Sequence, residues 1–207
     1  MVSFISDLIY DGKLCPNLDS EYYKTPPAKR KRLFPQKPIE IIDTSEFFDP
    51  QTRMETEVDS TYYNLCEAML SLQKVVSLVK EGERLSNICI ITPYKAHAEK
   101  IKEVFDSHSK YLYRTLERNI YTIDSFQGRE QDNVIINWVR SNYTSPGTTT
   151  RTGFLRDYRR VNVALSRAKK RLILIGDFET LTKSENMKVQ YIFSKIKNID
   201  REERIVI

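Results

Sequence analysis

Cysteine and histidine are scarce in this sequence, and each shortage excludes a class of protein. The three cysteines, Cys15, Cys66 and Cys89, are odd in number and form no Cys-x-x-Cys pair. This spacing argues against a disulfide framework and against a zinc ribbon. The two histidines, His97 and His108, have no neighbouring cysteine, so we expect no metal site. We therefore expect a protein of a reducing, intracellular compartment.

Long apolar stretches and glycine-rich loops are also missing. Apolar runs such as Ile88 to Ile91 are far shorter than the ~20 residues that cross a bilayer, so we expect no membrane association. None of the six glycines belongs to a Gly-x-Gly-x-x-Gly motif, which argues against a dinucleotide-binding enzyme. Gly12 precedes Lys13, but the earlier glycine and the hydroxyl of a phosphate-binding P-loop are absent.

What is present is enough for a globular core. Apolar residues make up 40% of the 207 residues, and we find no repeat or low-complexity segment. We expect one domain over residues 1–207, with a proline-rich basic connector over 15–38 and a terminal packing helix over 184–200.

Positive charge is in mild excess. A net charge of +5 and a pI near 9.0 suggest a polyanionic partner without requiring one. Four cations follow one another in the connector: Lys29, Arg30, Lys31 and Arg32. We interpret this run as part of an exposed loop, with a nuclear import signal or a nucleic-acid contact as alternatives.

Short β-branched runs alternate with helical patterns along the chain. The expected strands are IEIID from Ile39 to Asp43, the run ICII, NIYTIDSF, NVIINWVRS and RLILIG. The longest expected helix carries an apolar stripe at Val58, Tyr62, Leu65, Met69, Leu72, Val76 and Val79 and ends at Gly82. Further helices are expected over 2–9, 95–105 and 157–168. This alternation predicts an α/β fold in which helices cover both faces of a parallel sheet.

In such a fold the functional groups are expected at the carboxyl ends of the strands. The segments expected there are TPYK, TIDSFQGRE, WVRSN and IGD. All four are rich in groups that hold phosphates and bases.

Arginines crowd the predicted helix over 157–168. Three of them fall on one edge beside its buried stripe: Arg156, Arg160 and Arg167. Their mutual repulsion and the planar fork of each guanidinium favour an anion site. The alternative is that they pair with carboxylates such as Glu130 or Asp177 and only hold the helix.

A second informative stretch is TIDSFQGREQD, from Thr122 to Asp132. Backbone N–H groups between Ser125 and Gly128 are placed to face a phosphate, and Gly128 permits close approach. The alternative is an ordinary tight connection in which Asp124 caps a turn.

Three separated segments resemble the second motor-domain motifs of superfamily 1 helicases, in the branch of the nonsense-transcript regulator and senataxin-like proteins. The segments are IITPYKAH, TIDSFQGREQDNVIINWVRSN and GFLRDYRRVNVALSRAKKRLILIGD. The opening FISDLIYDGKL also resembles the segment that follows the Tyr-Arg-Met-His-Pro motif of this family. The resemblance covers nearly the whole chain, except the connector and residues 143–152. It implies a RecA-like fold of the P-loop NTPase type.

In this family two RecA-like domains clamp ATP and Mg²⁺, and the chain would supply the second domain. The resemblance implies that Arg167 is the arginine finger that reaches the γ-phosphate. It implies that Glu130 contacts the nucleotide sugar and that Arg160 supports the network. The loop is shaped by Gln127, Gly128 and Arg129.

The family also implies a set of nucleic-acid contacts: Pro93, Tyr94, Lys95, Thr122, Asp124 and Ser125. Hydroxyls, backbone donors and a lysine suit phosphates rather than bases, as a motor that steps along any sequence requires. Tyr94 either stacks on a base or faces the core.

We therefore expect the C-terminal half of an ATP-dependent helicase or translocase. Its partners would be single-stranded RNA or DNA and the first RecA-like domain of the same protein, and the family implies 5′-to-3′ movement. Because the chain lacks a Walker A loop, we expect it to be inactive alone. The alternative is a nucleic-acid-binding or protein-docking module without catalysis.

Overall fold

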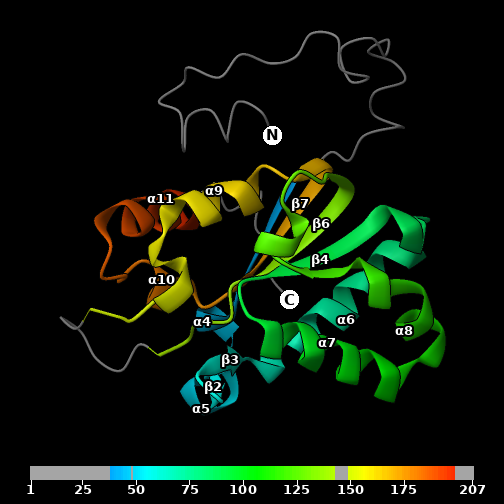
Figure 1. Cartoon of the computed structure of the whole chain (residues 1–207), viewed down its shortest axis with the longest axis horizontal. Coiled ribbons are helices and arrows are strands. Elements are labelled where there is room, and N and C mark those ends of the chain that lie inside the picture. The colour runs from blue at the N-terminus through cyan, green and yellow to red at the C-terminus, as the bar shows by residue number, and fades with distance from the viewer. Residues whose placement is uncertain (1–37, 48, 143–148, 199–207) are drawn as a thin grey trace, which may run out of the picture.

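The computed structural model describes residues 38–47, 49–142 and 149–198, and a five-stranded sheet lies at its centre (Figure 1). The strands follow the order β1-β7-β6-β4-β5, and every neighbouring pair is parallel. Their bounds are β1 Ile39–Asp43, β4 Ile88–Thr92, β5 Ile120–Thr122, β6 Gln131–Asn137 and β7 Ala168–Gly176. The predicted α/β fold with a parallel sheet is confirmed.

Apolar side chains fill β4 and the central runs of β6 and β7, because each face of the sheet is covered. Successive side chains of a strand point to opposite faces. In β4, Ile88 and Ile90 therefore enter one core, whereas Cys89 and Ile91 enter the other. This explains why these runs show no alternation between apolar and polar residues.

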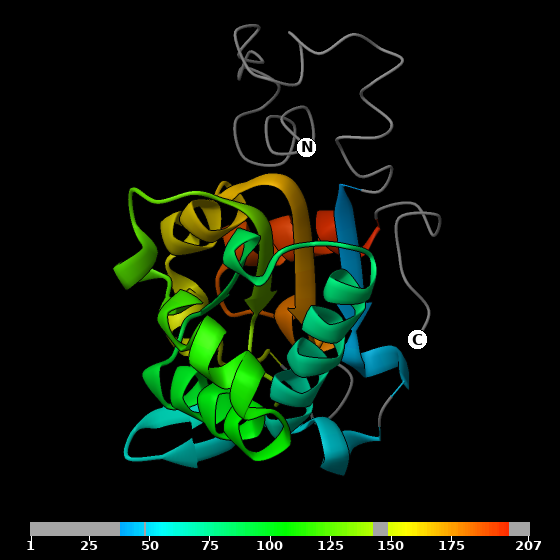
Figure 2. The same cartoon turned by 90° about the vertical axis from the view of Figure 1, so that its right-hand side faces the viewer.

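Three helices cover the first face (Figure 2): α6 Leu65–Lys80, α7 Lys95–His108 and α8 Lys110–Leu116. Asn64 caps α6, since its side-chain oxygen accepts the N–H of Glu67 at 3.1 Å. The fully buried side chains of this core include Leu78, Ile101 and Phe105.

The prediction for the longest helix was wrong at its start and in its buried face. Val58 and Tyr62 are not helical, because they lie on the two strands of a hairpin. Leu65 and Val79, predicted to be buried, are 53% and 39% exposed. Leu72 of the predicted stripe is buried, and the other residues that α6 buries include Ala68, Val75 and Leu78, which lie outside that stripe.

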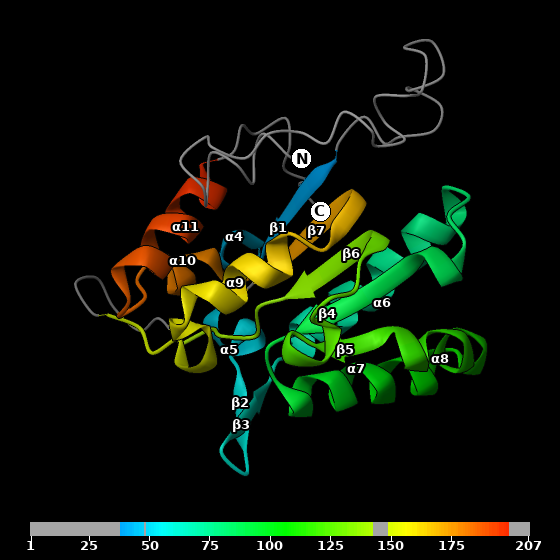
Figure 3. The same cartoon turned by 45° about the horizontal axis from the view of Figure 1, so that its top comes forward.

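The hairpin joins β2 Thr56–Val58 to β3 Thr61–Tyr63, and it extends from the body of the molecule (Figure 3). Asp59 and Ser60 form its two-residue turn, and both have positive φ, 47° and 63°. This is the conformation that matches the twist of the flanking strands. Two short helices precede the hairpin, α4 Thr44–Phe47 and α5 Pro50–Arg53.

Three helices cover the other face of the sheet: α9 Tyr158–Leu165, α10 Phe178–Leu181 and α11 Met187–Lys197 (Figure 1). Aromatic rings fill the core beneath them. The ring of Phe193 lies edge-on to Trp138 at 4.9 Å and to Phe178 at 6.0 Å between centroids.

Two predicted helices are shorter than expected, and two predicted segments lie outside the described residues. The helix expected over 157–168 is α9, and the terminal helix expected over 184–200 is α11. The helix expected over 2–9 and most of the connector over 15–38, with Lys29 to Arg32, fall outside the described residues. Within the described residues, no helix has the length and apolar character that crossing a membrane requires.

Candidate functional site

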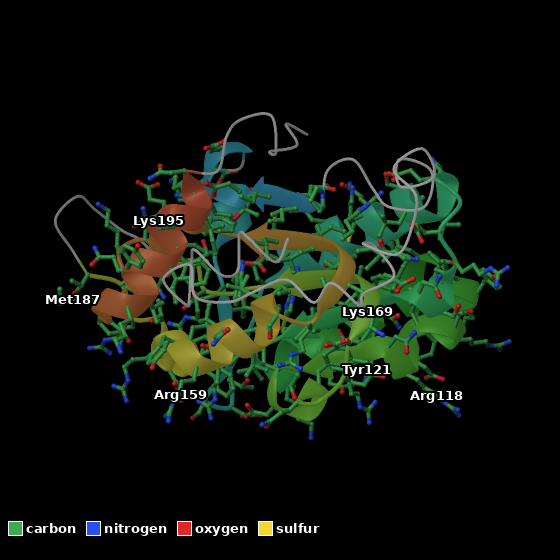
Figure 4. The ribbon with its side chains drawn as sticks, turned by 90° about the horizontal axis from the view of Figure 1, so that it is seen from above. Arg118, Tyr121, Arg159, Lys169, Met187 and Lys195 are labelled. Atoms are coloured by element: carbon green, nitrogen blue, oxygen red, sulfur yellow. The ribbon has the colours of Figure 1, made fainter. Side chains whose placement is uncertain are left out.

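The predicted nucleotide residues lie at the edge of the sheet where β6 and β7 begin. Glu130 directly precedes β6, and Arg167 directly precedes β7. The N–H of Gln131 donates to the carbonyl of Arg167 at 3.1 Å, so the two strand entrances lie together. Figure 4 looks onto the molecule from above and labels Lys169, two residues after Arg167.

The prediction that the segment TIDSFQGRE lies at the strand carboxyl ends is therefore wrong for residues 127–130. The segment after β5 starts at the carboxyl edge of the sheet. Because β5 and β6 are parallel to β4, it must cross to the opposite edge before β6 begins. Its first half stays at the carboxyl edge, and its second half lies at the amino edge.

The guanidinium of Arg167 is half-buried and faces the loop of residues 127–130. Its Nε donates to the carbonyl of Val163 at 2.8 Å, and its Nη1 donates to the carbonyl of Arg129 at 3.4 Å. Among the described residues Arg167 forms no ion pair. A cation held only by carbonyls keeps its charge available for an anion.

The loop beside Arg167 is open. The four residues Gln127, Gly128, Arg129 and Glu130 are exposed. Gly128 has φ +79°, a left-handed conformation that glycine adopts without strain, and open space lies where a Cβ would be. Arg129 lies over the ring of Tyr121, labelled in Figure 4, at 5.3 Å. This loop can accept a ligand without moving core residues.

Unlike the other predicted nucleotide residues, Arg160 contacts residues near the carboxyl edge of the sheet. Its Nε is 3.5 Å from a carboxylate oxygen of Asp124, and its guanidinium lies over the ring of Phe154 at 3.8 Å from the centroid. Asp124 thus pairs with an arginine, and the turn it was expected to cap carries no side-chain cap. These contacts tie α9 to the segment that crosses the sheet.

The other arginines of this region do not join a common edge. Arg156 lies in a short 3₁₀ turn, Gly153–Arg156, before α9. Asp157 accepts two hydrogen bonds from Arg159 at 2.9 and 3.0 Å. Figure 4 shows Arg159 at the margin of the molecule.

The alternative ion pairs with Glu130 and Asp177 are not formed by Arg156, Arg160 or Arg167. Asp177 lies 3.6 Å from Arg53, and Glu130 lies 3.9 Å from Lys169. The carboxylates that were expected to neutralise the arginines are therefore engaged with other cations.

The predicted nucleic-acid residues lie at the carboxyl ends of β4 and β5. Pro93 and Tyr94 are buried, whereas Lys95 is exposed at the first turn of α7. The hydroxyl of Tyr94 donates to the carbonyl of Thr152 at 3.3 Å and accepts the N–H of Phe154 at 3.3 Å. Burial raises the pKa of Tyr94. Its ring is 7% exposed, which favours the core-facing alternative.

Two hydroxyls close the turn after β5. Ser125 Oγ accepts the N–H of Thr122 at 3.0 Å and donates to the carbonyl of the same residue at 2.9 Å. Their hydroxyl oxygens also lie 3.0 Å apart. Both side chains keep contact with solvent, at the same edge of the sheet as Lys95.

A pocket of about 560 Å³ opens at this carboxyl edge. It is lined by residues 60–62 of the hairpin, residues 93–95 after β4, Arg140, Arg151, Gly153 and Phe154. Three of these residues are cations and three are aromatic, which is the composition that suits a single nucleic-acid strand. A side chain at Gly153 would come within 2.9 Å of the Tyr94 hydroxyl, so glycine is needed for this close packing.

Arg140 and Glu55 at this pocket were missed by the sequence analysis. Arg140 Nη2 lies 2.9 Å from a carboxylate oxygen of Glu55, and its guanidinium lies over the ring of Tyr62 at 4.0 Å. The signal was present, because Arg140 follows β6 in the segment WVRSN. Glu55 had no signal, since it precedes a hairpin that was interpreted as a helix.

The residues fit a phosphate ligand better than a metal ion. In the part of the chain that the structure describes, no three His, Cys, Asp or Glu side chains form a group that could hold a metal. The open loop at Gly128 and the uncommitted charge of Arg167 instead fit an anionic group.

Comparison with protein families gives a match to the AAA domain over residues 1–179. The chain belongs to the AAA domain family. The predicted resemblance to the nonsense-transcript regulators and their relatives is also confirmed, because proteins with these names are among its relatives.

Three relatives illustrate the similarity. The chain is 33% identical over 185 residues to "ATP-dependent helicase NAM7" of Saccharomyces cerevisiae, which covers 87% of this chain and 18% of that protein. It is 32% identical over 188 residues to "Regulator of nonsense transcripts 1 homolog" of Neurospora crassa, covering 88% and 16%. It is 38% identical over 127 residues to "Uncharacterized ATP-dependent helicase MJ0104" of Methanocaldococcus jannaschii, covering 61% and 16%. The chain spans less than a fifth of each of these relatives.

Proposed function

We propose that this chain is the second motor domain of an ATP-dependent helicase or translocase that acts on single-stranded RNA or DNA. The observation that carries the proposal is the position of Arg167 beside an open loop, without a carboxylate partner among the described residues. The names of the relatives, which are ATP-dependent helicases, support the same reaction. In this proposal residues 1–207 form a single RecA-like domain.

Arg167 would complete an ATP site that another domain supplies. During phosphoryl transfer, negative charge on the transferred group and the leaving oxygen must be met by cations that are already in position. The two carbonyls that accept from Arg167 hold its side chain toward the loop. A lysine at this position would donate from a single nitrogen and would lack the planar fork of the guanidinium.

The loop residues would bind the rest of the nucleotide. Glu130 would accept from the sugar hydroxyls, and the backbone around Gly128 has room for close approach. Arg160 would support this loop through Asp124 rather than contact ATP. Mg²⁺ would be held mainly by the first motor domain, since the described residues offer no acidic cluster.

The single strand would lie at the opposite edge of the sheet. Lys95, Arg151 and the hydroxyls of Thr122 and Ser125 would contact its phosphates. Such contacts grip a backbone without reading bases. Opening and closing of the cleft at Arg167 would then move the strand at the other edge through the rigid strands between them.

The test uses a protein that carries both motor domains. Arg167→Ala is expected to lower ATP hydrolysis by about 10³-fold or more, the range for an arginine finger. Binding of single-stranded oligonucleotides should change little, because Arg167 lies at the other edge. Arg159→Ala is the matched control, since the side chain of this neighbouring arginine is 76% exposed and, within the part of the chain that the structure describes, pairs only with Asp157.

If Arg167→Ala hydrolyses ATP as the unaltered protein does, the arginine-finger assignment is wrong. The chain would then act as a nucleic-acid-binding or protein-docking module.

A further inference from the structure

Val139 adopts a backbone conformation that its side chain disfavours. Its φ is +72°, in the left-handed region that β-branched residues rarely enter. The N–H of Arg140 donates to the carbonyl of Trp138 at 2.8 Å, two residues back, which makes Val139 the centre of a γ-turn with positive φ. Such strain persists only where surrounding groups enforce it.

Two buried side chains at the start of α6 enforce this turn. Both carboxylate oxygens of Glu67 accept the N–H of Val139, at 3.0 and 2.9 Å. Asn64 Nδ2 donates to the carbonyl of the same residue at 3.2 Å. Glu67 and Asn64 are both fully buried. The peptide groups on the two sides of Val139 are therefore fixed by one helix terminus.

The turn sets the position of the next side chain, Arg140. Its guanidinium is buried and lies over the ring of Tyr62 on the hairpin. Its Nη1 lies 3.5 Å from the hydroxyl of Tyr94, and its Nη2 pairs with Glu55 at 2.9 Å. Arg140 thereby joins the hairpin wall of the pocket to the wall that follows β4.

We propose that Glu67 and Asn64 are positioning residues for single-strand binding, because they hold Val139 in its strained turn and so place Arg140 where it assembles the phosphate-binding pocket. This inference rests on the proposed function, which puts a single strand in that pocket. The ligand class is a single-stranded phosphodiester, either RNA or DNA.

Two energetic penalties at the Val139 turn support a role for Glu67 beyond packing. Burial raises the pKa of Glu67 well above its usual value, which shows that the ionised carboxylate is unfavourable there. An apolar side chain of similar size would avoid this cost but would leave the N–H of Val139 without an acceptor. The positive φ of Val139 adds a second energetic penalty. Both penalties fall on residues that position Arg140 beside the pocket.

The experiment measures binding of the 207-residue chain to fluorescein-labelled oligouridylate and oligothymidylate by anisotropy. Glu67→Gln replaces one of the two oxygens that face the Val139 N–H with an amide N–H₂, which cannot accept, so we expect affinity for both probes to fall about tenfold. Val139→Gly removes the strain, because glycine adopts positive φ freely. In the Val139→Gly background, Glu67→Gln should therefore change affinity by less than about twofold.

Glu40→Gln is the matched control. Glu40 is also a buried carboxyl against α6, paired with Lys74 at 2.7 Å, but it lies on β1 and does not touch the Val139 turn. It should lower the melting temperature without changing affinity. If Glu67→Gln does not fold, Asn64→Asp replaces it, because this variant keeps the cap on α6 but cannot donate to Val139.

The outcomes separate the inference from the proposed function. If Glu67→Gln lowers only the melting temperature, or weakens binding equally in both backgrounds, the positioning role is overturned. If Arg140→Gln weakens binding while Glu67→Gln does not, the strand site stands and the positioning role fails. If the unaltered chain binds neither probe, the proposed strand site fails and takes this inference with it. If the unaltered chain binds one probe only, that probe names the nucleic acid, and the inference is supported if Glu67→Gln weakens its binding in the native background alone.

Discussion

Arginines close together in the sequence serve different purposes because different partners lie within reach. Arg159 forms two hydrogen bonds to Asp157 and points into solvent. Arg160 pairs with Asp124 and covers an aromatic ring. Only Arg167 is held by carbonyls alone among the described residues. At the residue scale, the candidate catalytic arginine is distinguished by its interaction partners and not by its residue type.

His97 gives a prediction on acid stability. It is fully buried, and its Nδ1 accepts the N–H of Asn64 at 3.2 Å. Burial lowers the pKa of His97 from 6.5 to about 3. A lowered pKa gives stability that is present above pH 6.5 and is lost as the pH falls toward the folded-state pKa. Below pH 6.5 we expect this group to cost about 1.4 kcal/mol of unfolding free energy per pH unit.

The measurement is urea unfolding at several pH values for the unaltered chain and for His97→Gln. The difference between the two pH profiles isolates His97 from the carboxyl groups. Glutamine keeps an acceptor for Asn64 but does not titrate, so its profile should be flatter in this range. Parallel profiles would show that His97 does not remain neutral in the folded chain.

At the scale of elements, the sequence predicted the strands better than the helix starts. Runs such as Ile88 to Ile91 are too short for a helix and too apolar for a surface, which leaves a buried strand. The start of α6 was mistaken because Val58 and Tyr62 happen to continue a helical spacing across the hairpin. Periodicity alone cannot distinguish a helical apolar stripe from strand residues that match the same spacing by chance.

The candidate site was predictable only in part. The motif segments were found, yet the pocket also depends on Glu55, Asn64 and Glu67, which meet Arg140 or its turn only in the folded chain. These contacts join residues more than 70 positions apart. No local pattern can indicate pairs at that separation.

The cap of α11 provides a prediction for this element. Asn186 accepts the N–H groups of Lys188 and Val189 with its side-chain oxygen, at 3.0 and 3.2 Å. Asn186→Ala should lower the unfolding free energy by about 1 kcal/mol, the usual effect of losing an N-cap. Gln190→Ala, at an exposed position of the same helix, should change it by less than about 0.5 kcal/mol. Equal values for the two variants in urea unfolding would show that the cap does not stabilise α11.

At the scale of the whole molecule, the two candidate sites lie at opposite edges of one sheet. Strands β6 and β4 join them as rigid elements, and the segment after β5 runs from one edge to the other. Asp124 and Arg160 connect that segment to α9, which leads to Arg167. This arrangement gives nucleotide and strand separate surfaces on the same rigid body.

The same arrangement predicts that the 207-residue chain does not hydrolyse ATP alone. It offers an arginine and a loop but has no P-loop to hold the phosphates. Phosphate release should equal the rate in buffer, with or without oligouridylate, in a coupled assay. Turnover of about 1 s⁻¹ or more, as in ordinary ATPases, would show that the chain holds a complete site.

The most direct test of the account is the chemical step itself. Single-turnover hydrolysis of ATP should be measured in a protein with both motor domains, with arginine or lysine at position 167. The account predicts that Arg167→Lys slows this step by about 10³-fold while the KM for ATP changes only a few-fold, because the contact acts in the transition state. A single-turnover rate for Arg167→Lys equal to that of the unaltered protein would contradict it.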